Sequence, residues 1–256
     1  MPDYTARELM AIAAARKITD GEIVFCGTGI SMLAAMAAKH INAPNSVIIF
    51  ETGAIDSQLE EIPMAVGDPR VMLGASSNSG LADSFALMQN RTTGRHVLGI
   101  LGAAQIDKYG NLNSTAIGDY FHPKVRFSGS GGACDVASFV DRTIIFMQHE
   151  RRKFVRQVDY LTSPGWLGGP GGRKKAGLTG NGPTAVISNL AVMGFDDTTR
   201  EMFLEAYFPG ASPQKVLENM EFTVDVSRAR ELEPPSEREL RILREQVDPQ
   251  RLILGG

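Results

Sequence analysis

The chain alternates between short apolar runs typical of buried strands and longer patterns typical of helices. Apolar, largely β-branched runs predict strands at residues 22–26, 46–50, 96–101, 142–147, 185–189 and 201–207. The intervening patterns predict helices from about residue 6 onward and at residues 30–39, 81–90, 212–219 and 236–246. This alternation predicts an α/β fold with an open, mainly parallel sheet flanked by helices.

Two of the predicted helices begin with a capping box, in which a hydroxyl side chain and a glutamate three residues later satisfy free backbone N–H groups. Thr5 with Glu8 opens the first helix, and Ser236 with Glu239 opens the last. These pairs fix the helix starts more sharply than apolar periodicity does.

Composition indicates an ordinary globular protein. The 256 residues are 43% hydrophobic, and neither an internal repeat nor a convincing linker divides them, so we expect a single domain over residues 1–256. The net charge of −3 gives no electrostatic footprint for nucleic acid or a membrane surface. Two cysteines and four histidines indicate neither a disulfide framework nor a metal site. Without a signal peptide or a long apolar run, the protein is expected to be cytoplasmic.

Glu51 is the first candidate for chemistry. It follows the predicted strand 46–50 directly and precedes Thr52 and Gly53. In open α/β sheets ligands bind outside the carboxyl ends of the strands, and Gly53 would let a ligand approach the backbone closely. Glu51 is therefore a candidate nucleophile or general base. The alternative is a solvated polar residue that ends a strand.

The strongest glycine cluster spans residues 128–135, just before a predicted helix. Such a loop exposes backbone N–H groups that can hold a phosphate or stabilise an oxyanion. It matches neither a P-loop nor a dinucleotide fingerprint. The alternative is a tight turn that needs positive φ and binds nothing.

Several weaker candidates remain open. Gln105 and Asn113 could supply amide donors to a thioester or carboxylate, although stabilisation of the turn near them is the better interpretation of these residues alone. Cys134 lacks a neighbouring base and is interpreted as a small buried hydrophobe. The charged run 149–153 is interpreted as a solvated face. The glycine-rich loop Gly165–Gly182 could be a lid, a subunit contact or a packed surface loop.

Two of these segments occur together in one known family. Glu51-Thr52-Gly53 resembles the Ser-Glu-Asn-Gly motif around the catalytic glutamate of the family I coenzyme A transferases. Residues 131–135 resemble their Gly-Gly-Ala-Met-Asp loop, with Cys134 in the methionine place. The likeness to B subunits of the glutaconate type covers nearly the whole chain. Further similar segments are 102–107, 110–115, 117–120, 147–150, 163–166, 208–222 and 244–249.

The resemblance implies the open α/β fold that is shared by NagB, RpiA and the CoA transferases. It also implies an A–B heteromer, expected to be a heterotetramer or heterooctamer, with its active site at the subunit contact. Coenzyme A would be a substrate, and no metal or other cofactor is expected. Glu51 would be the nucleophile, with oxyanion or CoA contacts expected from Gly53, Gln105, Asn113, Gly131, Gly132 and Ala133.

The implied reaction moves CoA between a small acyl-CoA, for which a dicarboxylic acyl group is a candidate, and an acceptor carboxylic acid. Thr52 departs from the serine or asparagine that relatives often have there. Some relatives on this scaffold are hydrolases or decarboxylases, and they tend to lack the glutamate or carry cysteine in its place. Retention of Glu51 favours transfer, while acyl-CoA hydrolysis, ring-opening hydrolysis, decarboxylation or a non-catalytic CoA-binding subunit are the alternatives.

Overall fold

A computed structural model describes residues 3–255 and divides the chain into two compact units. Unit 1 comprises the chain up to Ile100 together with the C-terminal segment from Pro234, and unit 2 comprises Leu101–Glu233. The α/β prediction is confirmed, because helices and strands alternate and the sheets are open.

Unit 1 has parallel strands at its centre and antiparallel strands at one side. Its strands are β1 (Ile23–Phe25), β2 (Val47–Ile49), β3 (Ala54–Ile55), β4 (Ser77–Asn78) and β5 (Val97–Gly102), whose last two residues belong to unit 2. The strand order is β5-β1-β2-β3-β4, in which β1 runs parallel to β5 and β2, and β3 runs antiparallel to β2 and β4. Its helices are α1 (Ala6–Ala15), α2 (Ile30–Ile41), η1 (Pro69–Met72), α3 (Leu81–Gln89), η2 (Gly94–His96), α7 (Glu237–Arg241) and η3 (Ile242–Val247).

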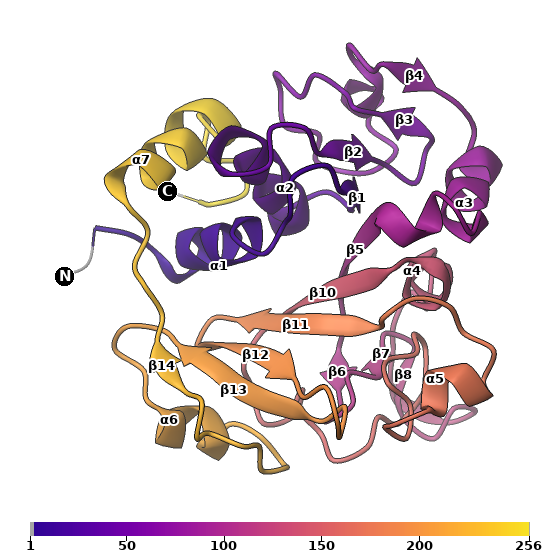
Figure 1. Ribbon diagram of the computed structural model, residues 1–256, viewed down its shortest axis with the longest axis vertical. Coiled ribbons are helices and arrows are strands. Elements are labelled where there is room, and N and C mark those ends of the chain that lie inside the picture. Colours follow the sequence, from indigo (N-terminus) through magenta and orange to yellow (C-terminus); the bar gives the residue numbers. More distant parts are fainter. Residues whose placement is uncertain (1–2, 256) are drawn as a thin grey trace. The chain divides into compact units, whose positions relative to one another are not determined.

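Small side chains let the helices of unit 1 pack closely. α1 and α2 are rich in buried alanines and pack against each other, and η3 packs against α2 (Figure 1). Both predicted capping boxes are confirmed, at Thr5 with Glu8 and at Ser236 with Glu239. The C-terminal segment is fixed by charge as well, because Arg244 Nε donates to the fully buried carboxylate of Glu8 at 2.7 Å.

Unit 2 contains a five-stranded sheet and two separate strand pairs. Its strands are β6 (Gln105–Ile106), β7 (Leu112–Asn113), β8 (Ala116–Gly118), β9 (Pro123–Arg126), β10 (Arg142–Met147), β11 (Pro183–Ser188), β12 (Ala191–Phe195), β13 (Met202–Tyr207) and β14 (Arg230–Glu231). In the order β14-β13-β12-β11-β10, β10 runs parallel to β11 and β13 parallel to β14, whereas β12 runs antiparallel to both neighbours. The helices are α4 (Ala133–Phe139), α5 (Gly172–Lys175) and α6 (Pro213–Glu218).

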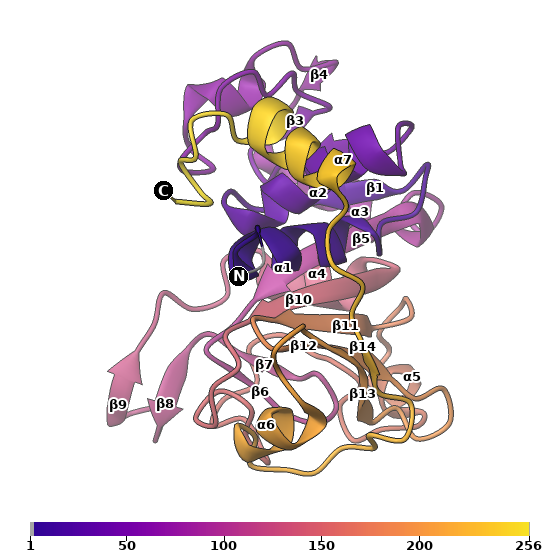
Figure 2. The same ribbon diagram turned by 90° about the vertical axis from the view of Figure 1, so that its left-hand side faces the viewer.

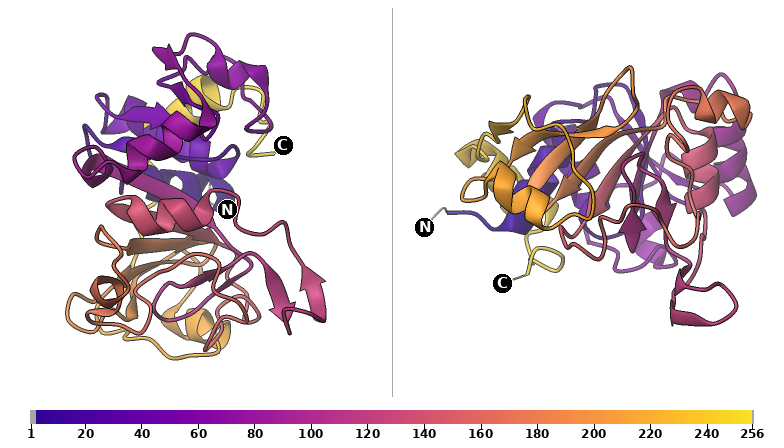
Figure 3. Two further views of the ribbon diagram at one scale, coloured as in Figure 1. Left: turned by 90° about the vertical axis from the view of Figure 1, so that its right-hand side faces the viewer. Right: turned by 90° about the horizontal axis from the view of Figure 1, so that it is seen from below.

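The pairs β6–β7 and β8–β9 lie outside the main sheet of unit 2. The β8–β9 hairpin extends away from the rest of that unit (Figures 2 and 3). Every strand and helix predicted from the sequence has a counterpart, with ends that differ by no more than about two residues. The strands that were not predicted are β12 and the short strands β3, β4, β6, β7, β8, β9 and β14. Among residues 3–255, no helix is long and apolar enough to cross a membrane.

Candidate active site

Glu51 lies in a tight turn that joins β2 to β3. Gly53 N donates to Phe50 O at 3.0 Å, and Phe50 N donates to Ala54 O at 3.0 Å, so the four residues 50–53 form a hydrogen-bonded turn. The chain therefore reverses at Glu51 instead of continuing into a helix. Because Glu51 is half-buried at the tip of this turn, a substrate can reach it while the backbone beneath it is held in place.

Gly53 is needed for the backbone of this turn. Its φ of +96° lies in a region that side chains strongly disfavour, and a Cβ at this position would lie 2.5 Å from Ser79 O. Ser79 N in turn donates to Gly53 O at 3.0 Å. The close neighbour of Gly53 is thus the chain's own backbone, whereas the sequence suggested a ligand.

A second contact fixes the start of the turn. The hydroxyl of Ser84, buried on α3, donates to Phe50 O at 3.0 Å. The turn that carries Glu51 is therefore bonded both to the segment before α3 and to α3 itself. These serines were not identified from the sequence, since a serine in a helix or loop carries no signal of its own.

Thr52 presents an unusual polar atom next to Glu51. Its Oγ1 is buried and has no hydrogen-bond partner within the part of the chain that the structure describes. A buried hydroxyl without a partner costs about 1–3 kcal/mol, so native proteins rarely keep one without use.

The glycine loop of unit 2 ends in the first turn of α4. Gly131 adopts φ +50°, and Ser130 caps the helix by accepting from Cys134 N through its hydroxyl and from Ala133 N through its carbonyl, both at 3.0 Å. The N–H groups of Gly131 and Gly132 donate to no acceptor in the described chain. Ala133, by contrast, uses its N–H internally. The positive φ that the turn interpretation requires is present, and two free N–H donors are present with it.

Hydrogen bonds link this loop to the neighbourhood of Asn113. Ser114 Oγ donates to Gly129 O at 2.9 Å, and Gly129 N donates to Ser114 O at 3.1 Å. Within unit 2, the structure therefore brings the glycine loop and the segment around Asn113 together.

Gln105 and Asn113 bind each other and their own loops. Asn113 Nδ2 donates to Gln105 Oε1 and to Ala116 O, both at 2.7 Å, and its Oδ1 accepts from Thr115 N at 2.9 Å. Gln105 Nε2 donates to Asp159 Oδ2 at 3.2 Å. Since both amide hydrogens of the buried Asn113 are engaged, the geometry favours the turn-stabilising interpretation. Asp159 was not identified from the sequence.

The loop Gly165–Gly182 packs against the rest of unit 2 through Arg173. The guanidinium is almost completely buried, and it donates to the carbonyl oxygens of Ala137, Ser138, Pro164, Gly165 and Thr179. Burial lowers the pKa of Arg173 to about 10. Trp166 Nε1 also donates to Pro183 O at 3.0 Å. Of the three interpretations of this loop, the packed one has direct support.

Two interpretations from the sequence are wrong. Cys134 is exposed, because α4 turns it outward at the glycine loop. His149 is buried, although the charged run after it is solvated: its ring lies 3.0 Å from Ser188 Oγ and 3.1 Å from Val216 O. Burial lowers the pKa of His149 to about 4, so the ring is neutral near neutral pH.

The predicted site residues are divided between the units. Glu51 and Gly53 belong to unit 1, together with Thr52. The other predicted residues belong to unit 2: Gln105, Asn113, Gly131, Gly132 and Ala133. The carboxylate of Glu51 lies on a fixed turn of unit 1, and the free N–H groups of Gly131 and Gly132 lie at the start of a helix of unit 2.

Comparison with known proteins identifies the family. The family model described as coenzyme A transferase matches residues 7–219. The B subunit of glutaconate CoA-transferase from Acidaminococcus fermentans is 44% identical over 96% of this chain and 94% of its own length. The B subunit of 3-oxoadipate CoA-transferase from Pseudomonas knackmussii is 34% identical over 95% and 94%, respectively.

A solved structure agrees with the sequence relatives. The crystal structure of glutaconate coenzyme A-transferase from Acidaminococcus fermentans matches with a TM-score of 0.95 at 42% identity, and the match covers 99% of this chain and 98% of that chain. The match confirms the predicted fold, an open and mainly parallel sheet with flanking helices. The chain therefore belongs to the coenzyme A transferase family of enzymes.

Proposed function

We propose that this chain is the B subunit of a CoA-transferase that works by ping-pong chemistry through a glutamyl-CoA thioester on Glu51. The observation that carries the proposal is the placement of Glu51, half-buried on a turn held by Gly53, Ser79 and Ser84. A nucleophile fixed in this way meets a bound acyl group with little loss of conformational entropy.

The proposed reaction has four balanced steps. The Glu51 carboxylate attacks the thioester carbonyl of the donor, and the CoA thiolate leaves to give an acyl-glutamyl anhydride. The thiolate then attacks the glutamyl carbonyl of the anhydride and releases the donor acid, which leaves CoA on Glu51. The acceptor carboxylate attacks this thioester, and the thiolate then attacks the acceptor carbonyl and regenerates the Glu51 carboxylate. No metal or redox cofactor takes part in this scheme.

Each tetrahedral intermediate carries an oxyanion. The N–H groups of Gly131 and Gly132 are free of internal acceptors, which supports their assignment as oxyanion donors in the assembled enzyme. Loss of one such donor typically costs about 3 kcal/mol of transition-state stabilisation. The Thr52 hydroxyl is a further free group beside the nucleophile.

The substrates proposed are a small dicarboxylic acyl-CoA and an acceptor acid. Both relatives are named for dicarboxylic acids, glutaconate and 3-oxoadipate, and both are named as B subunits. We therefore expect an A subunit that completes the enzyme as a heterotetramer or heterooctamer and forms part of the acyl pocket.

Covalent trapping tests the mechanism. Incubation of the assembled enzyme with glutaconyl-CoA, followed by borohydride reduction and peptide mass mapping, should place the modification on Glu51. Glu51→Gln should give no adduct and should lower transfer by at least about a thousandfold, since an amide is not a nucleophile. An adduct on another residue under turnover would contradict the mechanism.

Three alternatives make different predictions for the same enzyme. Hydrolysis, including ring opening, consumes the thioester without an acceptor acid, and decarboxylation releases carbon dioxide. A non-catalytic CoA-binding subunit predicts that Glu51→Gln leaves all activity intact. If the product is still a CoA thioester and the reaction requires an acceptor acid, the enzyme is a transferase and the alternatives are excluded.

A further inference from the structure

Unit 1 contains a cavity of about 550 Å³ at the end of the β2–β3 hairpin that lies away from Glu51. β2 and β3 are antiparallel and joined by the Glu51 turn, whereas the cavity is lined by Asp56 and by Ser57 after β3. Asp56 N donates to Ile48 O at 2.7 Å. Ile48, which comes three residues before Glu51, also lines the cavity. Its volume suits a small molecule.

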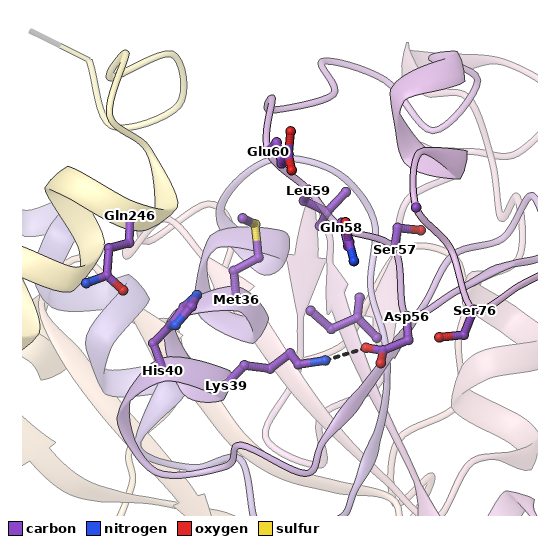
Figure 4. A pocket seen from close by; sticks show the side chains of 12 residues that line it. Met36, Lys39, His40, Asp56, Ser57, Gln58, Leu59, Glu60, Ser76 and Gln246 are labelled. Carbon is purple, nitrogen blue, oxygen red and sulfur yellow. Dashed lines mark hydrogen bonds and ion pairs between the residues drawn. The ribbon is translucent and has the colours of Figure 1, made fainter.

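Asp56 has a backbone conformation that aspartate adopts only occasionally. Its φ is +52°, and its carboxylate forms an ion pair with Lys39 from the last turn of α2 (Figure 4). Backbone conformations of this kind are concentrated at ligand-binding and functional sites, where the surrounding structure maintains them. Because Asp56 neutralises the charge of Lys39, a positive charge that attracts a ligand must come from other residues.

A second cavity, of about 470 Å³, shares His40 and Gln246 with the first. It is also lined by Arg238 and Arg241 of α7. Both arginines are exposed, and neither forms an ion pair within residues 3–255. The carboxylates of Asp56 and Glu60 line the larger cavity and not this one. A negatively charged group is therefore favoured beside the two arginines.

The larger cavity suits hydroxyl groups. Figure 4 shows His40 and Gln246 at one end and Ser57 and Ser76 at the other, with the Gln58 amide between them. Amide and hydroxyl side chains both donate and accept hydrogen bonds, as ligand hydroxyls do. The shared residues make the two cavities neighbours, so one ligand can occupy both.

We infer that this double cavity binds a phosphate monoester of a small polyhydroxylated compound. The phosphate lies among His40, Arg238 and Arg241, and the hydroxyl-bearing part lies in the larger cavity near Gln58 and Ser76. Guanidinium groups recognise phosphate through charge-assisted hydrogen bonds. The site is separate from the Glu51 turn, and its existence does not depend on the proposed transfer reaction.

Calorimetric titration of the purified protein at low salt tests the site, with glycerol 3-phosphate and inorganic phosphate as probes. Glycerol 3-phosphate should bind saturably to one site per chain and more tightly than inorganic phosphate. Arg238→Gln with Arg241→Gln should weaken glycerol 3-phosphate binding by about tenfold or more. Gln58→Ala with Ser76→Ala should lower the affinity for glycerol 3-phosphate towards that for inorganic phosphate. The same variant should leave the affinity for inorganic phosphate unchanged.

A matched control removes the same charge elsewhere on unit 1. Arg91→Gln with Arg95→Gln, both exposed, should leave the affinity of both probes unchanged. If both double variants weakened glycerol 3-phosphate binding equally, the effect would be one of net charge alone, and the inference would be overturned. Equal affinity for the two probes would also overturn it, as would the absence of saturable binding by the folded protein.

Discussion

At the scale of single residues, the groups with unusual surroundings are Glu51, Thr52 and His149. Glu51 could be identified from the sequence because a carboxylate directly after a buried strand breaks the apolar pattern. The lack of a partner for the Thr52 hydroxyl and the burial of His149 could not be predicted, because both depend on segments distant in sequence. Ser188 and Val216, the partners of His149, lie 39 and 67 residues away.

The first prediction at this scale concerns the free hydroxyl of Thr52. Thr52→Val keeps the shape of the side chain and removes a buried polar atom that has no partner. We expect the free energy of unfolding to be unchanged or higher by up to about 1 kcal/mol. If the hydroxyl binds the reacting group, kcat for CoA transfer should fall in the same variant.

Chemical denaturation with steady-state kinetics separates these two effects. Thr52→Ser, which keeps the hydroxyl, should retain kcat. A Thr52→Val enzyme that is less stable than the parent, with unchanged kcat, would contradict both parts of the prediction.

His149 gives the protein a pH-dependent stability. Burial lowers its pKa in the folded state to about 4, against an ordinary value of 6.5. As the pH falls below about 6.5, the unfolded chain takes up a proton that the folded chain does not, so the free energy of unfolding decreases until the pH reaches about 4. The full loss is about 3 kcal/mol, of which about 2 kcal/mol falls between pH 7 and pH 5.

Urea unfolding at a series of pH values tests this assignment. In His149→Gln, the free energy of unfolding should change less between pH 7 and pH 5 than in the parent, although the variant is less stable at pH 7. His96→Gln, at an exposed position, is the control and should keep the slope of the parent. An unchanged slope in His149→Gln would assign the pH dependence to other groups.

At the scale of elements, α4 is held at both ends. Its first turn is capped by Ser130, and the carbonyl oxygens of Ala137 and Ser138 near its end accept from Arg173. A cation at the C-terminal end of a helix also opposes the partial negative charge there. Because α4 begins at the glycine loop, the loop Gly165–Gly182 contributes to the position of the free N–H groups of Gly131 and Gly132.

Removal of Arg173 should destabilise unit 2. Arg173→Met keeps the bulk of the side chain but leaves several buried carbonyl oxygens without donors, and we expect a loss of about 3 kcal/mol in the free energy of unfolding. Arg173→Lys should recover only part of this loss, since a single ammonium nitrogen cannot replace both Nη1 and Nη2, which donate to different sets of carbonyls.

Lys174→Met serves as the matched control, because Lys174 is the exposed neighbour on the same short helix. It should change stability by no more than about 0.5 kcal/mol. Equal stability of the two methionine variants, measured by denaturant unfolding, would show that the carbonyl contacts of Arg173 contribute little.

At the scale of the whole molecule, the sequence predicted the class of fold and the main elements, but it did not predict β12 or the shortest strands. Long apolar runs such as β10 are recognised because nearly every position is buried. β12 was missed because Gly194 interrupts it, and the structure shows why glycine is there: a Cβ would lie 2.6 Å from the ring of Phe203 on β13. Strands of two residues, such as β3, are too short to show any periodicity.

The burial of Arg173 could not be predicted from the sequence either, since a charged residue in a glycine-rich loop is ordinarily exposed. The candidate site followed a similar pattern. Glu51 and the glycine loop were found because their residue types are unusual at those positions. The bonds of Ser79 and Ser84 that hold the Glu51 turn join segments that are distant in sequence, so they could not be predicted.

The return of the C-terminal segment to unit 1 has a consequence for synthesis on the ribosome. Glu8 is completely buried, and its partner Arg244 emerges 236 residues later. Unit 2 is continuous in sequence and can fold as soon as its last strand has left the exit tunnel. Unit 1 cannot bury Glu8 beside its partner until Arg244 has also left the tunnel, so the unit that carries Glu51 is completed after unit 2.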